Sequence, residues 1–344
     1  MSENRQNAQY NEGEIDLREL FMALWKRKIM IISVALIGAI LAGLFSIFVL
    51  SPVYDTKLNI VINMPETYNT RYGEYTLPIT TNDQYINLIT SNNVLINTVK
   101  DMGYNAGEVT VEGLKNRISI SKVETKAIDV EQNSFDVTVS ADDPQEALKL
   151  AQTLYDNYTE FADVMTKERA IKYYINQFSV DIKTLELSLK TTQELLKKNE
   201  KLLTQTPQTI NQKAAMSQVT DTKDIVVLEN IINPNYTKVE NDIIVNKQTI
   251  NSIEEAIRTK NESLSQLDME KKAIEKYYKT GNEAKLDSGL IGVIETSIYL
   301  PSPPVAPTQK TSPSNLMNTA IGLVIGGMLG VMIALVKEYW LKKA

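Results

Sequence analysis

The chemistry open to this chain of 344 residues is limited by two missing residue types, because it contains neither cysteine nor histidine. The first absence removes disulfide bonds and thiolate nucleophiles, and the second removes the commonest general base and metal ligand. Carboxylates remain, and two adjacent pairs stand out, Asp142/Asp143 and Glu254/Glu255. Two carboxylates flanking a sugar linkage carry out glycoside hydrolysis, so one hypothesis is an enzyme such as a glycosidase or a glycan ligase.

Both pairs also have a simpler interpretation. Neighbouring side chains on a helix or its cap do not face each other across a substrate at the separation that hydrolysis needs. Asp142 and Asp143 precede Pro144, the pattern of a helix start with an acidic N-cap and proline at the first helical position. Glu254 and Glu255 fit a solvated helix face. We therefore predict that the chain is not an enzyme, with no catalytic residue, metal site or cofactor.

Two uncharged segments indicate a membrane protein. Ile29–Leu50 and Leu316–Val336 contain no charged side chain, and each is long enough to cross a hydrocarbon core of roughly 30 Å. The first begins too far from Met1 and lacks a small-residue cleavage site, which favours a retained span over a signal peptide. The alternative is a pair of buried helices in a soluble protein. Basic side chains flank both segments on their outer sides: Lys26, Arg27 and Lys28 before the first, and Lys337, Lys342 and Lys343 after the second.

This charge distribution predicts cytoplasmic termini and an extracytoplasmic loop of residues 51–315. The whole chain has 36 basic and 42 acidic side chains. Residues 1–50 and 316–344 together hold 8 of the basic and 6 of the acidic ones. The loop therefore keeps 28 basic and 36 acidic side chains, a net charge of −8. A surface of that sign does not attract nucleic acid, so we predict no nucleic-acid partner.

The second segment and its approach have two further features. Gly322, Gly326 and Gly330 share one helix face in a doubled GxxxG pattern, which predicts close packing on Ile29–Leu50 or between protomers; incidental glycines are the alternative. The approach is a proline-rich segment that should be extended and stiff, because proline fixes φ and lacks a backbone donor. Its prolines are Pro301, Pro303, Pro304, Pro307 and Pro313.

The first segment is preceded by Glu14–Lys28, whose apolar residues have helical spacing. This helix either lies along the inner membrane surface or simply extends the span. In the loop, β-branched residues and alternation predict strands, and a broad apolar face predicts one helix, Asp83–Met102. Strands next to both spans imply one α/β base domain built from both ends of the loop. The predicted strands are Tyr54–Met64, Leu114–Val123, Phe135–Ser140 and Gly289–Leu300.

Two long amphipathic helices should form an antiparallel, coiled-coil-like arm. Gln145–Thr206 contains no proline or glycine, and Lys238–Lys279 repeats its heptad spacing; between them Gln208–Ile232 is a weaker helical segment. A compact helical bundle is the alternative. Asn246, Lys260 and Lys271 fall at core positions of the second heptad. The apolar positions, called here the arm seam, include Ile175, Phe178, Ile182, Leu185, Leu189, Ile250, Ile253, Ile257, Leu264 and Leu267.

The predicted fold class is therefore an α+β membrane protein: two transmembrane helices flank an extracytoplasmic α/β base domain with a long helical arm. The predicted segments are a cytoplasmic segment 1–28, transmembrane helices 29–50 and 316–336, base-domain parts 51–143 and 281–315, an arm 144–280 and a cytoplasmic tail 337–344.

The order of these features resembles the Wzz-type chain-length determinants, also called polysaccharide co-polymerases. The resemblance rests on EIDLRELFMALWKRK with the span that follows it, and on PSPPVAPTQKTSPSNLMN with the glycine-bearing second span, together roughly a third of the chain. The chain departs from relatives that include a tyrosine kinase, because it has no GxxxxGK[ST] loop.

The resemblance implies a non-enzymatic regulator of surface polysaccharide length, such as capsule or O-antigen, in the bacterial cytoplasmic membrane. Its protomers would form a homo-oligomeric ring that scaffolds a polysaccharide polymerase and the growing lipid-linked glycan, in contact with membrane lipid. The alternative is a membrane adaptor or activator for a separate bacterial tyrosine kinase in polysaccharide export.

Overall fold

The computed structural model describes residues 17–340 except 106, 108, 123–132, 212–229 and 281–291. The chain divides into two compact units. Unit 1 comprises residues 1–61, 98–156 and 300–344, and unit 2 comprises residues 62–97 and 157–299. Unit 1 thus combines both ends of the chain.

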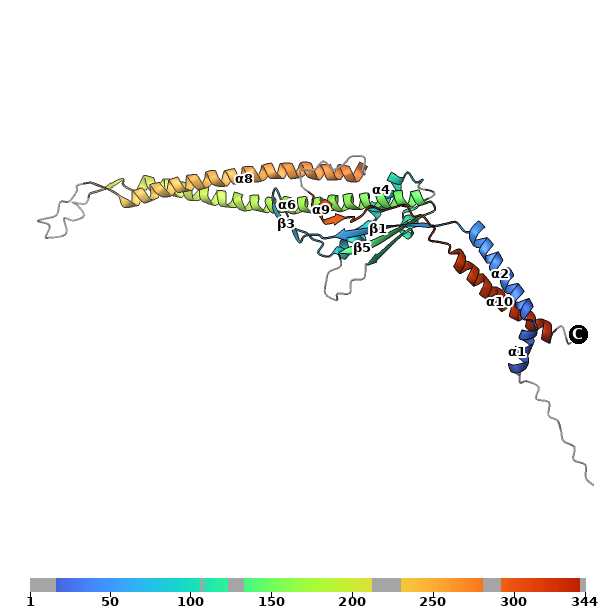
Figure 1. The fold of residues 1–344 in the computed structure, drawn as a ribbon. Helices are drawn as coiled ribbons and strands as arrows, with labels where there is room; N and C mark the ends of the chain where they lie inside the picture. Colours follow the sequence, from blue (N-terminus) through green and yellow to red (C-terminus); the bar gives the residue numbers. More distant parts are fainter. Residues whose placement is uncertain are drawn as a thin grey trace, which may run out of the picture. The chain divides into compact units, whose positions relative to one another are not determined.

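The parts of unit 1 over residues 17–48 and 315–339 are helical (Figure 1). Helix α1 (Leu17–Lys26) ends at Arg27, whose φ of −104° and ψ of 15° are not helical, and α2 (Lys28–Phe48) follows. Helix α10 (Asn315–Tyr339) starts after Ser314, whose hydroxyl accepts a hydrogen bond from the Met317 N–H. The two uncharged segments are therefore helical, and α1 is a separate helix rather than an extension of α2.

Unit 1 also contains three strands whose buried side chains are mostly apolar. Strand β1 (Tyr54–Ile62) pairs antiparallel with β5 (Ser134–Ala141), which also pairs with β4 (Ile118–Lys122). The pairing places Leu58 opposite Val137 and Ile60 opposite Phe135. All four of these side chains are fully buried, because alternate residues of a strand point to the same face. Helix α5 (Val111–Asn116) precedes β4.

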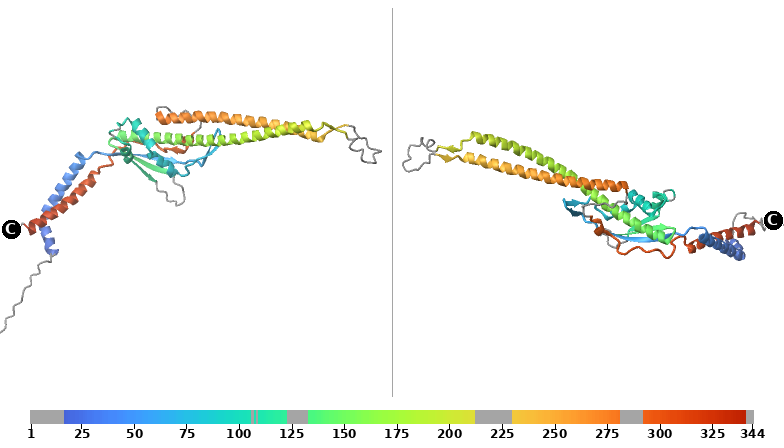
Figure 2. Two further views of the ribbon diagram at one scale, coloured as in Figure 1. Left: turned by 180° about the vertical axis from the view of Figure 1, so that it is seen from behind. Right: turned by 90° about the horizontal axis from the view of Figure 1, so that it is seen from above.

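Unit 2 contains short elements and most of the arm, whose residues 144–156 belong to unit 1. Its short elements are α3 (Asn82–Asn87), a 3-10 turn η1 (Leu88–Thr90), α4 (Asn92–Met102, which ends in unit 1), a hairpin of β2 (Thr67–Thr70) and β3 (Gly73–Thr76), α9 (Ile294–Ser297) and β8 (Ile298–Tyr299). Helices α6 (Pro144–Gln205) and α8 (Pro234–Thr280) are 62 and 47 residues long and lie side by side (Figure 1, Figure 2). Strands β6 (Thr209–Ile210) and β7 (Ile231–Ile232) pair antiparallel beyond their ends. The mixed fold and the long helical arm are thus confirmed.

Several predicted boundaries were wrong. The helix predicted over Asp83–Met102 is interrupted at Ser91, which is extended (φ −69°, ψ 150°). The strand predicted over Leu114–Val123 begins only at Ile118, because the Thr110 hydroxyl accepts from Gly113 N–H and starts α5. Gly289–Leu300 is strand only at β8, where its residues are described, and is otherwise a short helix. Most of Gln208–Ile232 lies outside the described residues, and its described ends form β6 and β7 rather than helix.

Two strand predictions were right: β1 corresponds to Tyr54–Met64, and β5 to Phe135–Ser140. The hairpin β2–β3 was not predicted, because strands of four residues give too short a pattern to recognise. The predicted domain boundaries remain predictions.

Candidate functional site

The glycine face of α10 lies directly against α2. Gly322, Gly326 and Gly330 are buried, and Ala334 continues their spacing. A methyl group added at Gly326 would lie 2.8 Å from the Val34 carbonyl oxygen, so the two backbones approach too closely for any side chain there. At Gly322 the same methyl group would meet the side chain of Ala42 at 2.4 Å.

Polar contacts join the two helices at both ends. The Arg27 guanidinium lies 3.3 Å (Nε) and 3.1 Å (Nη2) from Glu338 Oε2, and Lys26 Nζ lies 3.7 Å from Oε1 of the same carboxylate. At the other end the fully buried Ser46 hydroxyl donates to Asn315 Oδ1 at 3.0 Å and accepts from Asn318 Nδ2 at 2.9 Å. These contacts fix the register of the helix pair, and sequence reasoning did not find them.

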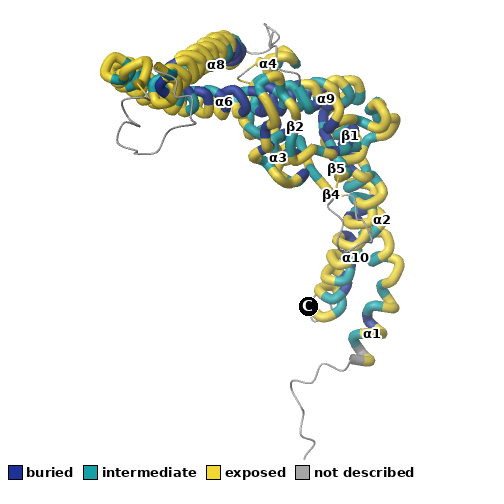
Figure 3. The backbone as a smooth tube through the Cα atoms, turned by 90° about the vertical axis from the view of Figure 1, so that its left-hand side faces the viewer, coloured by how far each residue is buried: buried dark blue, intermediate teal, exposed yellow. Residues whose placement is uncertain are grey.

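The outer surfaces of the pair are apolar and exposed (Figure 3). In α2 only Ala39 and Ser46 are buried, whereas the core helix of a soluble protein would bury a whole apolar face. Both helices are long and apolar enough to cross a membrane. In α1, Phe21, Met22 and Trp25 are exposed, and the Lys28 ammonium lies 4.5 Å from the centre of the Trp25 indole.

The proline-rich segment contains no helix, and backbone hydrogen bonds join its end to Val53. Val53 N–H donates to the Ser312 carbonyl at 2.8 Å, and Thr311 N–H donates to the Val53 carbonyl at 2.8 Å. Pro313 is buried next to this bridge, and the Ser312–Pro313 peptide bond is cis. Pro304 and Pro307 are half-buried, while Pro301 and Pro303 are exposed. The chain leaving α2 and the chain entering α10 are therefore joined by backbone hydrogen bonds.

The arm-seam residues of α6 and α8 are buried or half-buried. Phe178, Ile182 and Leu267 are buried. The other seven positions of the seam are half-buried: Ile175, Leu185, Leu189, Ile250, Ile253, Ile257 and Leu264. Lys260 reaches across to Asp181, with Nζ 2.7 Å from Oδ2, and also lies over the Phe178 ring at 4.2 Å.

One predicted core position of the second heptad was wrong. Lys271 is exposed, and the preceding Glu270 is buried instead, where its Oε1 accepts from Arg71 Nη2 at 3.3 Å. Beyond Leu267 the buried face continues through Glu270, Ile274 and Tyr277, because the helix there packs on a cluster of aromatic rings rather than on a single facing helix. That cluster includes Tyr72, Tyr75, Tyr174 and Phe178.

One member of each adjacent carboxylate pair has a structural partner. Asp143 caps α6, since its Oδ1 accepts from the N–H groups of Gln145 (2.8 Å) and Glu146 (3.1 Å). Glu255 pairs with Arg258 on the exposed face of α8. Among the described residues, no group of three or more acidic side chains is placed to hold a metal ion.

A further carboxylate lies in unit 1 among side chains that the sequence did not associate. Tyr104 donates to Glu146 Oε1 at 2.5 Å, and Arg117 Nη1 lies 3.7 Å from the same oxygen. Burial, and then the hydrogen bond to Glu146, raise the pKa of Tyr104 well above its usual value. The phenol therefore stays protonated and links α6 to the segment after α4.

Comparisons with known proteins identify a family and a relative of this chain. The model of the family described as "Wzz: Chain length determinant protein" matches residues 13–102. The capsular polysaccharide biosynthesis protein CpsC of Streptococcus pneumoniae is 30% identical over 170 residues, which are 46% of this chain and 70% of that protein.

Two solved structures are similar at low identity. A full-length bacterial polysaccharide co-polymerase covers 94% of this chain and 97% of its own, with 15% identity and a TM-score of 0.42. A fragment of WzzB, a polysaccharide co-polymerase from Salmonella Typhimurium, covers 76% and 100%, with 12% identity and a TM-score of 0.27. On the identity and coverage of its capsular relative and the match of the family model, this chain belongs to the Wzz family of polysaccharide chain-length determinants.

Proposed function

We propose that this chain regulates the length of a surface polysaccharide as a non-enzymatic scaffold in the bacterial cytoplasmic membrane. In this proposal α2 and α10 span the bilayer as a pair, and the arm lies outside the cytoplasm. The exposed apolar surface of the helix pair supports the membrane assignment, because helices that are apolar all round are stable in lipid. The exposed aromatic side chains of α1 fit an interfacial position.

The observation that carries the proposal is the arm. At about 1.5 Å per residue, α6 extends over roughly 90 Å and α8 over roughly 70 Å. A seam and cross-helix ion pairs hold the two together, as at Lys260–Asp181 and Lys247–Glu200. Such a paired helix is a stiff spacer. A spacer can set a distance for the polymerase and the growing lipid-linked glycan, which are the partners that we propose.

A second observation supports assembly of several copies. Large apolar side chains on the side of α6 away from the seam recur at spacings of seven or eight residues, so they share one helix face. They are 46% to 67% exposed. We call them the outer stripe: Tyr173, Val180, Leu187, Leu195 and Leu202. A stripe of this kind can pack on a second copy of the chain, and a heterologous contact that closes on itself gives a ring.

The test is to shorten the arm without touching the helix pair. Residues 189–257 are replaced by a helix–helix linker of about four residues. The cross-helix pairs Lys260–Asp181 and Lys247–Glu200 lie on either side of Ser188 along α6 and of Arg258 along α8. Ser188 and Arg258 therefore lie at nearly the same position along the arm, where the linker joins them. We expect polymer to be made in normal amount but with an altered length distribution in gel electrophoresis.

The matched control keeps the arm and replaces Glu254 and Glu255 by alanine, which should leave both amount and length unchanged. Loss of all polymer from this control, at normal protein level, would favour an enzyme. An unchanged length distribution in the shortened variant would contradict the scaffold and favour the second candidate, an adaptor for a separate tyrosine kinase.

A further inference from the structure

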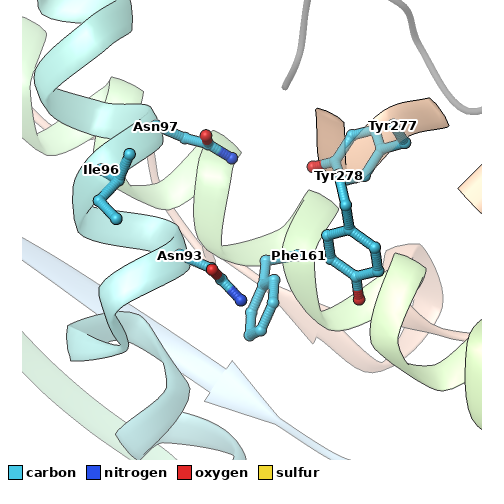
Figure 4. Close-up of a pocket in the computed structure, with 6 residues that line it drawn as sticks. All are labelled: Asn93, Ile96, Asn97, Phe161, Tyr277 and Tyr278. Carbon is cyan, nitrogen blue, oxygen red and sulfur yellow. The ribbon is translucent and has the colours of Figure 1, made fainter. Parts of the chain in front are cut away.

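Unit 2 contains a cavity of about 190 Å³ that is separate from the helix pair. Helices α4, α6 and α8 supply its lining: Asn93, Ile96, Asn97, Phe161, Tyr277 and Tyr278 (Figure 4). Pockets for drug-sized ligands measure roughly 300–1,000 Å³. A cavity of this size therefore suits a single small ring.

The polar groups of the cavity are available to a ligand. Asn93 and Asn97 are one helical turn apart, and their amides project from α4 toward Phe161 and the two tyrosines (Figure 4). Within the part of the chain that the structure describes, neither amide has a hydrogen-bond partner. Each amide offers two donors and one acceptor. Together they can therefore bind two neighbouring groups that both donate and accept.

The opposite wall is aromatic and held in place. Phe161 and Tyr277 are almost fully buried. The Tyr277 and Tyr278 rings contact each other edge to face, with centroids 5.8 Å apart. Tyr278 also donates to Glu168 Oε2 at 3.0 Å, and Lys172 pairs with the other oxygen of that carboxylate. Ring faces that are already fixed lose little entropy when a ligand packs on them.

The lining residues that the structure describes carry no charge. Burial, and then the hydrogen bond to Glu168, raise the pKa of Tyr278 above its usual value, so its phenol stays neutral at physiological pH. Among the residues that the structure describes, no lysine, arginine, aspartate or glutamate lines the cavity. Residues 51–315, which include the cavity, carry a net charge of −8, from 28 basic and 36 acidic side chains. An anionic ligand is therefore disfavoured.

We propose that this cavity binds one neutral pyranose ring of a polysaccharide. A pyranose has an apolar C–H face, which fits the aromatic wall, and a rim of hydroxyl groups that donate and accept, which fits the two amides. The ligand's identity as part of a glycan rests on the proposed function, whereas its class follows from the lining. Binding of one ring would hold the glycan at the C-terminal end of α8, without any chemical step.

The experiment measures saturation-transfer NMR on the full chain in lipid nanodiscs, free of sugar-based detergents. The probes are neutral trisaccharides of glucose, galactose and N-acetylglucosamine, and a trisaccharide of glucuronic acid. We expect saturation of ring protons of at least one neutral probe and weaker transfer to the glucuronate. The variant Asn93→Ala with Asn97→Ala should weaken the dissociation constant roughly fivefold or more, since two hydrogen bonds are lost.

The control is Asn92→Ala, an exposed amide on the same helix that does not line the cavity. Tyr278→Phe should keep most of the binding, and Tyr278→Ala should lose it, because the ring face makes the contact. Absence of transfer to every neutral probe, preference for the glucuronate, or equal affinity in the double variant would overturn the proposal. Sugar binding together with no effect of arm shortening on polymer length would contradict only the proposed function and leave the cavity's binding role in place.

Discussion

Two adjacent glycines of α10, Gly326 and Gly327, differ in the space available for a side chain. A methyl group at Gly326 would lie 2.8 Å from the Val34 carbonyl oxygen and 3.0 Å from Ala35 Cα. The same group at Gly327 would meet only Ala35 Cβ, at 4.0 Å. Gly326→Leu should therefore force the helices apart, at a cost of roughly 1–3 kcal/mol, and Gly327→Leu should not.

The measurement is the melting temperature of both variants in nanodiscs, with polymer length in cells as the second readout. Both substitutions change helix propensity equally, so that term cancels in the comparison. We expect Gly326→Leu to melt lower and to shift polymer length at unchanged protein level. Equal melting temperatures would mean that the glycine face does not hold the helix pair together.

Residues that meet across long sequence separations were the ones that sequence reasoning missed. Arg27 and Glu338 are 311 positions apart, and Ser46 and Asn318 are 272 apart. Their types gave no pattern, because Arg27 and Glu338 lie in the charged flanks of apolar segments. The glycine spacing, by contrast, is local and periodic. It was visible in the sequence, although which helix the glycines face was left open.

At the scale of elements, predictability followed the length of the repeating pattern. Helices α6 and α8 repeat their heptad over many turns, so their ends were predicted within a few residues. The interruption at Ser91 and the short helix α5 depend on one or two residues and were missed. Tertiary packing decided the change of buried face at Glu270, which no heptad could show.

The arm seam makes a prediction about stability. Leu185→Asn with Leu189→Asn places two polar side chains in the seam, and Leu187→Asn with Leu195→Asn makes the same change on the outer stripe. Burying a leucine contributes roughly 1.5–3 kcal/mol, and both seam leucines are half-buried. We expect the seam pair to lose roughly 2 kcal/mol of stability and the stripe pair far less.

Thermal unfolding followed by circular dichroism checks this, since most of the helix content lies in the arm. The two double variants share residue type and helix, so helix propensity affects them alike. Equal loss of stability in both would mean that the seam is no better packed than the outer surface of α6.

At the scale of the whole molecule, the proposed topology can be tested directly, because the chain has no native cysteine. Single cysteines replace three exposed residues, Ser265 on α8, Ser302 in the proline-rich segment and Trp340 after α10. In intact cells a membrane-impermeant maleimide should label the first two and leave Trp340→Cys unlabelled until the membrane is permeabilised. Labelling of Trp340→Cys in intact cells would reverse the assignment.

The outer stripe gives the prediction on assembly. The five large apolar side chains of the outer stripe are exposed along one face of a polar helix, and such a patch usually marks an interface. Leu187→Asn with Leu195→Asn should therefore convert the oligomer to smaller species, measured by mass photometry in nanodiscs, while the melting temperature of the arm stays nearly unchanged. The seam variant should instead keep the oligomer's mass and lower the melting temperature of the arm. If the stripe variant keeps the wild-type mass distribution, the copies do not meet along α6, and assembly must depend on another surface.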